Sequence, residues 1–210
     1  MNLQVFKQEN EQIQALSAHL HKLIDQILSV QDKVTVALSG GTSPINLFKH
    51  LNSLDLPWNK INLTLVDERI VDEINHPDSN QTLVCKYLLQ NKALAAKFIP
   101  IDPSQNVKID IAILGMGTDG HSASIFPDCD ELNQALTTQN QYLYTNPKSA
   151  KYRRLSLSLN GITNIPKLML SISGEIKLKV FKEAMRETNL NYPISYILNQ
   201  RPDLQVFWHE

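Results

Sequence analysis

Apolar residues along the chain recur with two different periods, which predicts a protein built from both helices and strands. Within residues 3–30 the leucines and isoleucines lie three and four positions apart, and Gln and Glu fill positions between them. This spacing is typical of an amphipathic helix. The segment VTVAL at 34–38 is instead a short apolar, β-branched run, which is typical of a strand buried on both faces of a sheet.

A glycine turn and a second helix are predicted after this strand. The segment SGG at 39–41 interrupts the apolar run. Either Thr42 or Ser43 can then cap a helix whose first position is Pro44, where the missing N–H group costs nothing. The local order is therefore strand, glycine turn and helix.

The same unit occurs again further along the chain. INLTLV at 61–66 predicts a strand, and a polar stretch leads to a helix that begins from Asp78 or Ser79. Two strand–helix units favour the α/β class. Strands are also predicted at 97–100 and 109–114, but the connection between them is shorter than a helical crossover needs. We therefore expect these two strands not to be direct parallel neighbours.

The last third of the chain continues the pattern. It predicts strands near 141–144, 154–159, 167–172 and 204–208, and a helix from about 174 to 188. No internal repeat, low-complexity tract or linker divides the sequence, and 210 residues suffice for one domain with a full core. We expect residues 1–210 to form a single α/β domain.

Composition excludes several classes of partner. The formal net charge is -1, so the chain has no general electrostatic attraction to nucleic acid or to an anionic membrane. The N-terminal segment lacks the apolar core of a signal peptide, and no run approaches the about 18 apolar residues of a membrane span. We expect a cytoplasmic protein. Its two cysteines, Cys85 and Cys129, allow no disulfide framework, and we expect both to be reduced.

The segment LSGGTSP at 38–44 is a candidate phosphate site. Its unpaired N–H groups and the positive end of the following helix dipole would point to one place, which suits a phosphate. The alternative is an ordinary turn whose glycines only make the bend. The segment is neither a Walker loop nor a GxGxxG fingerprint, so a nucleotide is not favoured.

The segment VDERI at 66–70 lies directly beyond the second predicted strand. It carries Asp67 and Arg69 at the carboxyl end of that strand, where ligands bind in open α/β sheets. Arg69 can hold a phosphate or carboxylate through two N–H groups. A salt bridge among the charged residues of this loop is the alternative.

The segment GMGTDGHSASIFP at 115–127 brings a third polar loop to the same sheet edge. Three glycines in six positions allow a ligand to approach the main chain. His121 is the candidate general base, and Asp119 is placed to orient its ring and fix its tautomer. Ser122 and Ser124 are alternative nucleophiles, but neither lies in a GxSxG elbow. The other histidines have no metal-ligand spacing, so we expect no metal.

A basic segment, NPKSAKYRR at 146–154, precedes another predicted strand. Its cations are Lys148, Lys151, Arg153 and Arg154. Lys177 lies in the first turn of a predicted helix, where a cation opposes the helix dipole unless an anion is close. We expect one or two of these cations at the site and the others on a solvated basic face.

These motifs together resemble the 6-phosphogluconolactonase family. LSGGTSP, VDER followed by PDSN, GMGTDGHSASIFP, and RRLSLSLNGI followed by SGEIK occur in the family's order over about residues 30–208. DGHSASIFP matches the family's DGHTASLFP-like signature at its histidine. The resemblance implies a Rossmann-like α/β fold, with an open, mostly parallel sheet and helices on both faces. It also implies hydrolysis of 6-phospho-D-glucono-1,5-lactone to 6-phosphogluconate, without a metal, nucleotide or other cofactor.

The resemblance also implies roles for individual residues. His121 corresponds to the family's catalytic histidine and Asp119 to its neighbouring acid. The implied substrate- and phosphate-binding residues are Gly40, Gly41, Thr42, Asp67, Arg69, Lys148, Arg154 and Lys177. The chain departs from the family's pattern at 101–108, where relatives usually carry another helix. It also has GGTSP where GGSTP is more usual, a swap that keeps both hydroxyls.

Two other functions share parts of this pattern. A glucosamine-6-phosphate deaminase or related aldose–ketose isomerase resembles the chain in its SGG turn, its DE pair and its GH-containing loop, and would use Asp67 as the base. Its GHIAFNEP-like segment carries an acidic residue that SASIFP lacks. A non-catalytic sugar-phosphate sensor would keep the site and lose the chemistry, but His121 and Asp119 are both present. We therefore expect a lactonase acting on a small sugar-phosphate lactone. Because no long exposed apolar stripe is evident in the sequence, we expect it to be a monomer.

Overall fold

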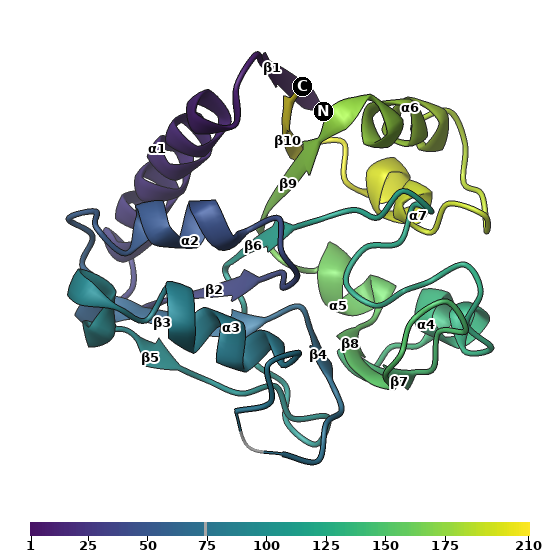
Figure 1. The fold of residues 1–210 in the computed structure, drawn as a ribbon, viewed down its shortest axis with the longest axis horizontal. Helices are drawn as coiled ribbons and strands as arrows, with labels where there is room; N and C mark the ends of the chain where they lie inside the picture. The colour runs from purple at the N-terminus through teal and green to yellow at the C-terminus, as the bar shows by residue number, and fades with distance from the viewer. Residues whose placement is uncertain (74) are drawn as a thin grey trace.

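The main sheet of the protein has seven parallel strands (Figure 1). In the computed structural model, which describes residues 1–73 and 75–210, the strand order is β1-β10-β9-β6-β2-β3-β5, and each neighbouring pair is parallel. The strands are β1 (Asn2–Phe6), β2 (Val34–Leu38), β3 (Ile61–Leu65), β5 (Lys97–Phe98), β6 (Ile111–Leu114), β9 (Lys167–Ser173) and β10 (Gln205–His209). The predicted α/β fold with a mostly parallel sheet is confirmed.

Helices cover both faces of this sheet, with α1 to α3 on one side in Figure 1 and α4 to α7 on the other. Their bounds are α1 (Glu9–Leu28), α2 (Ile45–Leu51), α3 (Asn80–Tyr87), α4 (Leu132–Thr137), α5 (Leu159–Thr163), α6 (Gly174–Ala184) and α7 (Ile194–Gln200). Strand β6 shows why two layers are needed. Ile111 and Ile113 pack into the first helical layer, and Ala112 and Leu114 into the second, because successive side chains of a strand point to opposite faces. In the part of the chain that the structure describes, no helix is long and apolar enough to cross a membrane.

A small antiparallel sheet stands beside the carboxyl end of β3. It contains β4 (Asp67–Arg69), β8 (Arg154–Leu157) and β7 (Tyr142–Thr145), in that order. The sequence pattern predicted only a polar stretch at 67–78, so β4 was missed. Three residues are too few to show a strand period, and β4 exists because it pairs with β8, far away along the chain.

The N-terminal segment differs from its prediction. Residues 3–30 were expected to form one helix, but Asn2–Phe6 is an edge strand that pairs with β10, and α1 begins only at Glu9. The carboxylate of Glu11 accepts hydrogen bonds from the N–H groups of Lys7 and Gln8 (3.1 and 3.3 Å). These bonds satisfy main-chain donors at the helix start and place it there.

The start of α2 also differs from its prediction. The helix begins at Ile45, the residue before it is Pro44, and no side chain caps it. The main-chain oxygen of Thr42 accepts the N–H of Ile45 instead. The hydroxyl groups of Thr42 and Ser43 are therefore not used as helix caps, and both residues line the pocket described below.

The strands predicted from the sequence are found within a few residues of their expected positions. The strands predicted at 97–100 and 109–114 are not neighbours, because β2 and β3 lie between β6 and β5. Residues 101–108 contain no helix or strand. The helix predicted to reach 188 ends at Ala184, and helices α4, α5 and α7, each of five to seven residues, were not predicted. Elements of that length span too few turns to show a clear 3.6-residue period.

Candidate active site

A pocket of about 560 Å³ lies where β2, β6, β9 and β10 end. Parallel strands bring their carboxyl ends to one edge of a sheet, and the loops that follow form the usual ligand site of such folds. Loops after β2 and β6, strands β4 and β8, and the first turn of α6 all contribute to its wall. Of the residues predicted from sequence, it is lined by Gly40, Gly41, Thr42, Asp67, Arg69, His121, Arg154 and Lys177.

His121 and Asp119 form a hydrogen-bonded pair on the loop after β6. Nδ1 of His121 lies 2.6 Å from Oδ1 of Asp119, and the same oxygen accepts the main-chain N–H of His121 at 3.2 Å. A carboxylate can only accept hydrogen bonds, so Nδ1 carries the proton and Nε2 of the neutral ring keeps a free lone pair. The ring also stacks on Phe126, with centroids 3.9 Å apart and planes 20° from parallel. The imidazole is thus fixed both in tautomer and in orientation.

The electrostatics of Asp119 support this arrangement. Partial burial acts to raise the pKa of its carboxyl, but the hydrogen bond and the charge of His121 outweigh burial, and the net pKa lies below the ordinary value. Asp119 therefore remains an anion throughout the neutral range. An anion at Nδ1 stabilises the imidazolium that forms whenever Nε2 takes up a proton.

The glycines of this loop make room for the pair. A Cβ atom on Gly117 would overlap both Nδ1 of His121 and Oδ1 of Asp119. Gly120 has φ +76°, and a Cβ atom there would lie 2.8 Å from Cα of Tyr192. Gly117 is thus required by close approach of side chains, and Gly120 by its backbone conformation.

Arg69 and Arg154 stand side by side at the pocket wall, because they are opposite each other in the β4–β8 register. Arg154 is 8% exposed, and its Nη1 lies 3.7 Å from Oδ2 of Asp67. Burial, and then the positive charge of Arg69, lower the pKa of Arg154. The Nε atom of Arg69 is buried without a hydrogen-bond partner in the described part of the chain. Two adjacent cations with spare donors make this wall suitable for an anion.

Asp67 is held by neighbours on three sides. Its carboxylate accepts a 2.5 Å hydrogen bond from Oγ of Ser124 and a longer one from Nδ2 of Asn80, and it faces Arg154. Asp67 is only 6% exposed. Its geometry suits a fixed counter-charge to the arginines better than a mobile proton carrier.

Neither serine of the loop is arranged as a nucleophile. Ser124 donates its hydroxyl proton to Asp67, and Ser122 donates to the main-chain oxygen of Gly115. Both serines are at most 1% exposed. An attacking serine needs its proton directed to a base and its oxygen directed to the substrate, so these two hydroxyls instead hold the loop.

Substitution of Ser124 by alanine is expected to affect stability more than catalysis. The buried carboxylate of Asp67 loses a donor, which should lower the free energy of unfolding by about 1–3 kcal/mol, while kcat stays close to that of the wild type. Chemical denaturation and steady-state kinetics measure the two effects, with Ser122→Ala as the matched control. If Ser124→Ala lost as much kcat as removal of His121, Ser124 would instead be the nucleophile.

The turn after β2 offers unused main-chain donors. Among the described residues, the N–H groups of Gly40, Gly41 and Thr42 have no protein partner. A Cβ atom on Gly40 would overlap the side-chain amide of Asn80, whereas Gly41, with φ +87°, faces open space. The main chain here can therefore approach and bind an oxyanion or a phosphate.

Lys177 reaches the pocket from the first turn of α6. Burial lowers the pKa of its ammonium group, and it has no hydrogen bond or salt bridge to any residue within 1–73 and 75–210. A partly buried, unpaired cation favours a negatively charged ligand nearby. This is the arrangement that the position of Lys177 in the sequence suggested.

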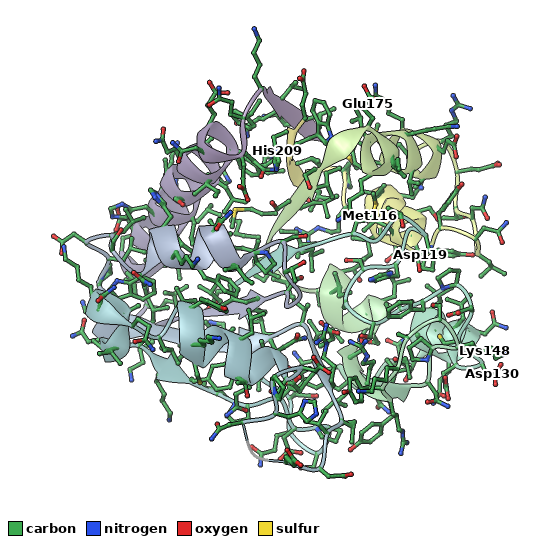
Figure 2. The ribbon with its side chains drawn as sticks, viewed as in Figure 1. Met116, Asp119, Asp130, Lys148, Glu175 and His209 are labelled. Atoms are coloured by element: carbon green, nitrogen blue, oxygen red, sulfur yellow. The ribbon has the colours of Figure 1, made fainter. Side chains whose placement is uncertain are left out.

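The structure does not bring Lys148 into the pocket. Its side chain is 65% exposed and pairs with Asp130 at 2.5 Å, and both residues lie beside α4 at the outer edge of the molecule (Figure 2). The hydrogen bond from Lys148 to Asp130 raises the pKa of the lysine. Lys151 and Arg153 are also exposed and contact Tyr152 and Tyr144. Of the four cations in the basic segment, Arg154 alone lines this pocket.

Sequence reasoning gave no role to several residues of the site. Phe126, Asn80, Glu9 and His209 line the pocket. Phe126 belongs to the DGHSASIFP segment and Asn80 to the PDSN segment, so their motifs carried a signal for them. Glu9 and His209 lie at opposite ends of the chain, and the pairing of β1 with β10 brings those ends together. Among the described residues, no group of three or more His, Cys, Asp or Glu residues could hold a metal ion.

Comparison with known proteins places the chain in one family. The family Glucosamine-6-phosphate isomerases/6-phosphogluconolactonase matches residues 7–208. The 6-phosphogluconolactonase of Helicobacter pylori (strain J99) is 41% identical, with 96% of this chain and 95% of the relative covered. That of Neisseria meningitidis (strain MC58) is 36% identical, with 95% of each covered. The crystal structure of a 6-phosphogluconolactonase from Shewanella baltica superposes with a TM-score of 0.92 at 32% identity, covering 100% of this chain and 98% of that one. The chain belongs to the glucosamine-6-phosphate isomerase/6-phosphogluconolactonase family, as a lactone hydrolase of the 6-phosphogluconolactonase type.

Proposed function

We propose that the protein hydrolyses 6-phospho-D-glucono-1,5-lactone to 6-phospho-D-gluconate, with His121 as the general base. The observation that carries this proposal is the Asp119–His121 pair. Its histidine has a free Nε2 atom and lines a pocket that also contains two adjacent arginines. A neutral imidazole held in one tautomer is the arrangement that general-base catalysis requires. The arginine pair supplies a place for the phosphate.

The reaction follows from this geometry. Nε2 of His121 removes a proton from a water molecule as the water oxygen attacks the lactone carbonyl carbon, and a tetrahedral oxyanion forms. When the oxyanion collapses, the bond from the carbonyl carbon to the ring oxygen breaks. His121 returns the proton to the departing ring oxygen, so the base is regenerated and the open-chain acid is released. Asp119 stabilises the imidazolium between the two steps.

The oxyanion needs donors that are in place before it forms. On the loop after β6, the N–H groups of Gly115 and Gly117 are already bound to Ser39 Oγ and to the main-chain oxygen of His121. The free N–H groups of the turn at 40–42 are therefore better candidates. Preorganised donors of this kind are typically worth about 2.7–4 kcal/mol each to the transition state.

Arg69 and Arg154 bind the phosphate in this proposal, with Lys177 as a further cation in the same pocket. The phosphate takes no part in the bond changes, so its binding energy serves to orient the lactone against His121. All of these groups come from one chain, so the proposed reaction does not need a second subunit, in keeping with a monomer. Lys148 would have to leave Asp130 to take part, and we assign it no role in this mechanism.

Two arms of one assay test the proposal against its closest rival. Freshly generated 6-phosphogluconolactone, in mildly acidic buffer where spontaneous opening is slow, should be hydrolysed faster than background. Glucosamine 6-phosphate should release no ammonia, because a deaminase would need Asp67 as its base and Asp67 is held by Ser124 and Arg154. Release of ammonia without lactone hydrolysis would move the assignment to the deaminase. Binding of 6-phosphogluconate without either reaction would make the protein a sensor.

A further inference from the structure

Both arginines of the pocket are held by one pair of residues outside it. Tyr152 lies two residues before Arg154, and its main-chain oxygen accepts a hydrogen bond from Nε of Arg154 at 3.2 Å. The hydroxyl group of Tyr152 donates to Oδ2 of Asp78 at 2.6 Å. The main-chain oxygen of Asp78 in turn accepts a hydrogen bond from Nη1 of Arg69 at 2.5 Å. One tyrosine is thus connected directly to one guanidinium and through one aspartate to the other.

Contacts around Tyr152 fix its ring and its hydroxyl. His76 meets the ring edge-on, with centroids 5.7 Å apart. The ammonium of Lys151 lies 4.6 Å from the ring centroid and donates to the hydroxyl at 2.6 Å. The hydroxyl oxygen accepts a hydrogen bond from Lys151, and the hydroxyl group donates one to Asp78, so its direction is determined. The hydrogen bond from Tyr152 is also the main cause of the lowered pKa of Asp78.

Arg69 needs this support more than Arg154 does. Arg154 is buried, and its Nη1 group faces Asp67. Arg69 is only partly buried, its Nε atom has no partner among the described residues, and its one side-chain hydrogen bond is to the main chain of Asp78. Whatever fixes the main chain at Asp78 therefore fixes the guanidinium of Arg69. The main-chain N–H of Asp78 donates to Nδ1 of His76 at 3.0 Å within the same loop, and the Tyr152 hydroxyl ties this loop to the residues before β8, on which Arg154 lies.

We infer that Tyr152 is a positioning residue for the anion-binding arginines, acting on Arg69 through Asp78 and setting the affinity of the pocket for the phosphate of the substrate. This inference rests on the proposed function, in which the two arginines bind that phosphate. Tyr152 itself does not contact the reacting atoms. Loss of its hydroxyl therefore acts first on substrate binding, and kcat should change far less than KM.

The test is the Tyr152→Phe variant of the full chain, which removes the hydroxyl and keeps the ring. We expect KM for 6-phosphogluconolactone to rise about tenfold, the effect of weakening one hydrogen bond to a charged group, with kcat nearly unchanged. The inhibition constant of inorganic phosphate, which reports on the anion-binding groups of the pocket and not on the lactone carbonyl, should rise by a similar factor. A purely structural role would not produce a change in KM and phosphate inhibition with kcat preserved.

Changes at Asp78 extend the test. Asp78→Ala should reproduce the effect of Tyr152→Phe, and the double variant should be no worse than either single variant, because both remove the same link. Asp78→Asn keeps an oxygen that can accept the hydroxyl proton, and it should restore most of the affinity. Additive losses in the double variant would contradict the inference.

Tyr144→Phe is the matched control. Tyr144 lies on β7 in the same small sheet, is 40% exposed and has Arg153 over its ring, 4.3 Å from the centroid. Removal of its hydroxyl group should leave KM and the inhibition constant of phosphate unchanged. Two outcomes would overturn this inference but not the proposed function: an equal rise of KM in both tyrosine variants, or no rise of KM in Tyr152→Phe while the wild type is fully active. A wild type that does not hydrolyse the lactone would overturn the proposed function instead.

Discussion

Replacement of His121 by alanine is expected to lower kcat for 6-phosphogluconolactone by about 10²–10⁴-fold, the usual contribution of a general base. KM should change little, because Arg69 and Arg154 lie on β4 and β8, away from the loop that carries His121, and remain in place. The measurement is the initial rate of lactone hydrolysis, corrected for the spontaneous reaction.

Two further variants separate this role from a general effect of losing a histidine. His50→Ala removes a histidine of α2 that does not line the pocket, and it should keep the wild-type rate. Asp119→Asn leaves the ring in place but removes the anion that selects its tautomer, so it should lose part of the rate that His121→Ala loses. A His121→Ala protein with wild-type kcat would contradict the general-base mechanism outright.

Much of the site could be predicted from sequence because its parts follow parallel strands. Segments 38–44 and 115–127 each come directly after a buried apolar run, and parallel neighbours necessarily present their carboxyl ends at one edge. The pairing of β2 with β6 then brings the two loops together. This inference needed only local patterns and one general rule of topology.

The pairing of distant segments could not be predicted in the same way. Arg69 and Arg154 are adjacent only because β4 pairs with β8, and three residues of β4 carry too little pattern to show a partner. The edge strand β1 likewise depends on β10, from the other end of the chain. In both cases the stabilising hydrogen bonds join segments that are far apart in the chain, and neither segment's sequence indicates which other segment it will pair with.

The basic segment shows a further limit. Consecutive residues of a strand face opposite ways, so only one of Arg153 and Arg154 could be directed into the pocket. The sequence predicts a strand that begins at 154, as observed, but it does not say which face of that strand is turned toward the pocket, and therefore which of the two arginines points inward. Lys148 precedes the strand on a loop, where the nearest acid decides its direction, and that acid is Asp130.

Substitution of Gly117 by alanine is expected to reduce kcat by about 10²-fold, although Gly117 carries no side chain and does no chemistry. Its Cβ atom would overlap both Nδ1 of His121 and Oδ1 of Asp119, so the ring or the carboxylate must move. Displacement of a catalytic group by about 1 Å is enough for a loss of that size. Gly117 does not have a positive φ, so backbone strain should add little and the protein should still fold.

The Gly117→Ala experiment compares kcat with the thermal midpoint of unfolding. Thr118→Ala is the matched control, because Thr118 is the exposed next residue of the same loop and its shortening leaves the pair untouched. In a His121→Ala background, Gly117→Ala should cause no further loss of kcat, since the group that it displaces is already absent. Wild-type kcat in Gly117→Ala, or an additional loss in the double variant, would show that the spacing of His121 and Asp119 does not set the rate.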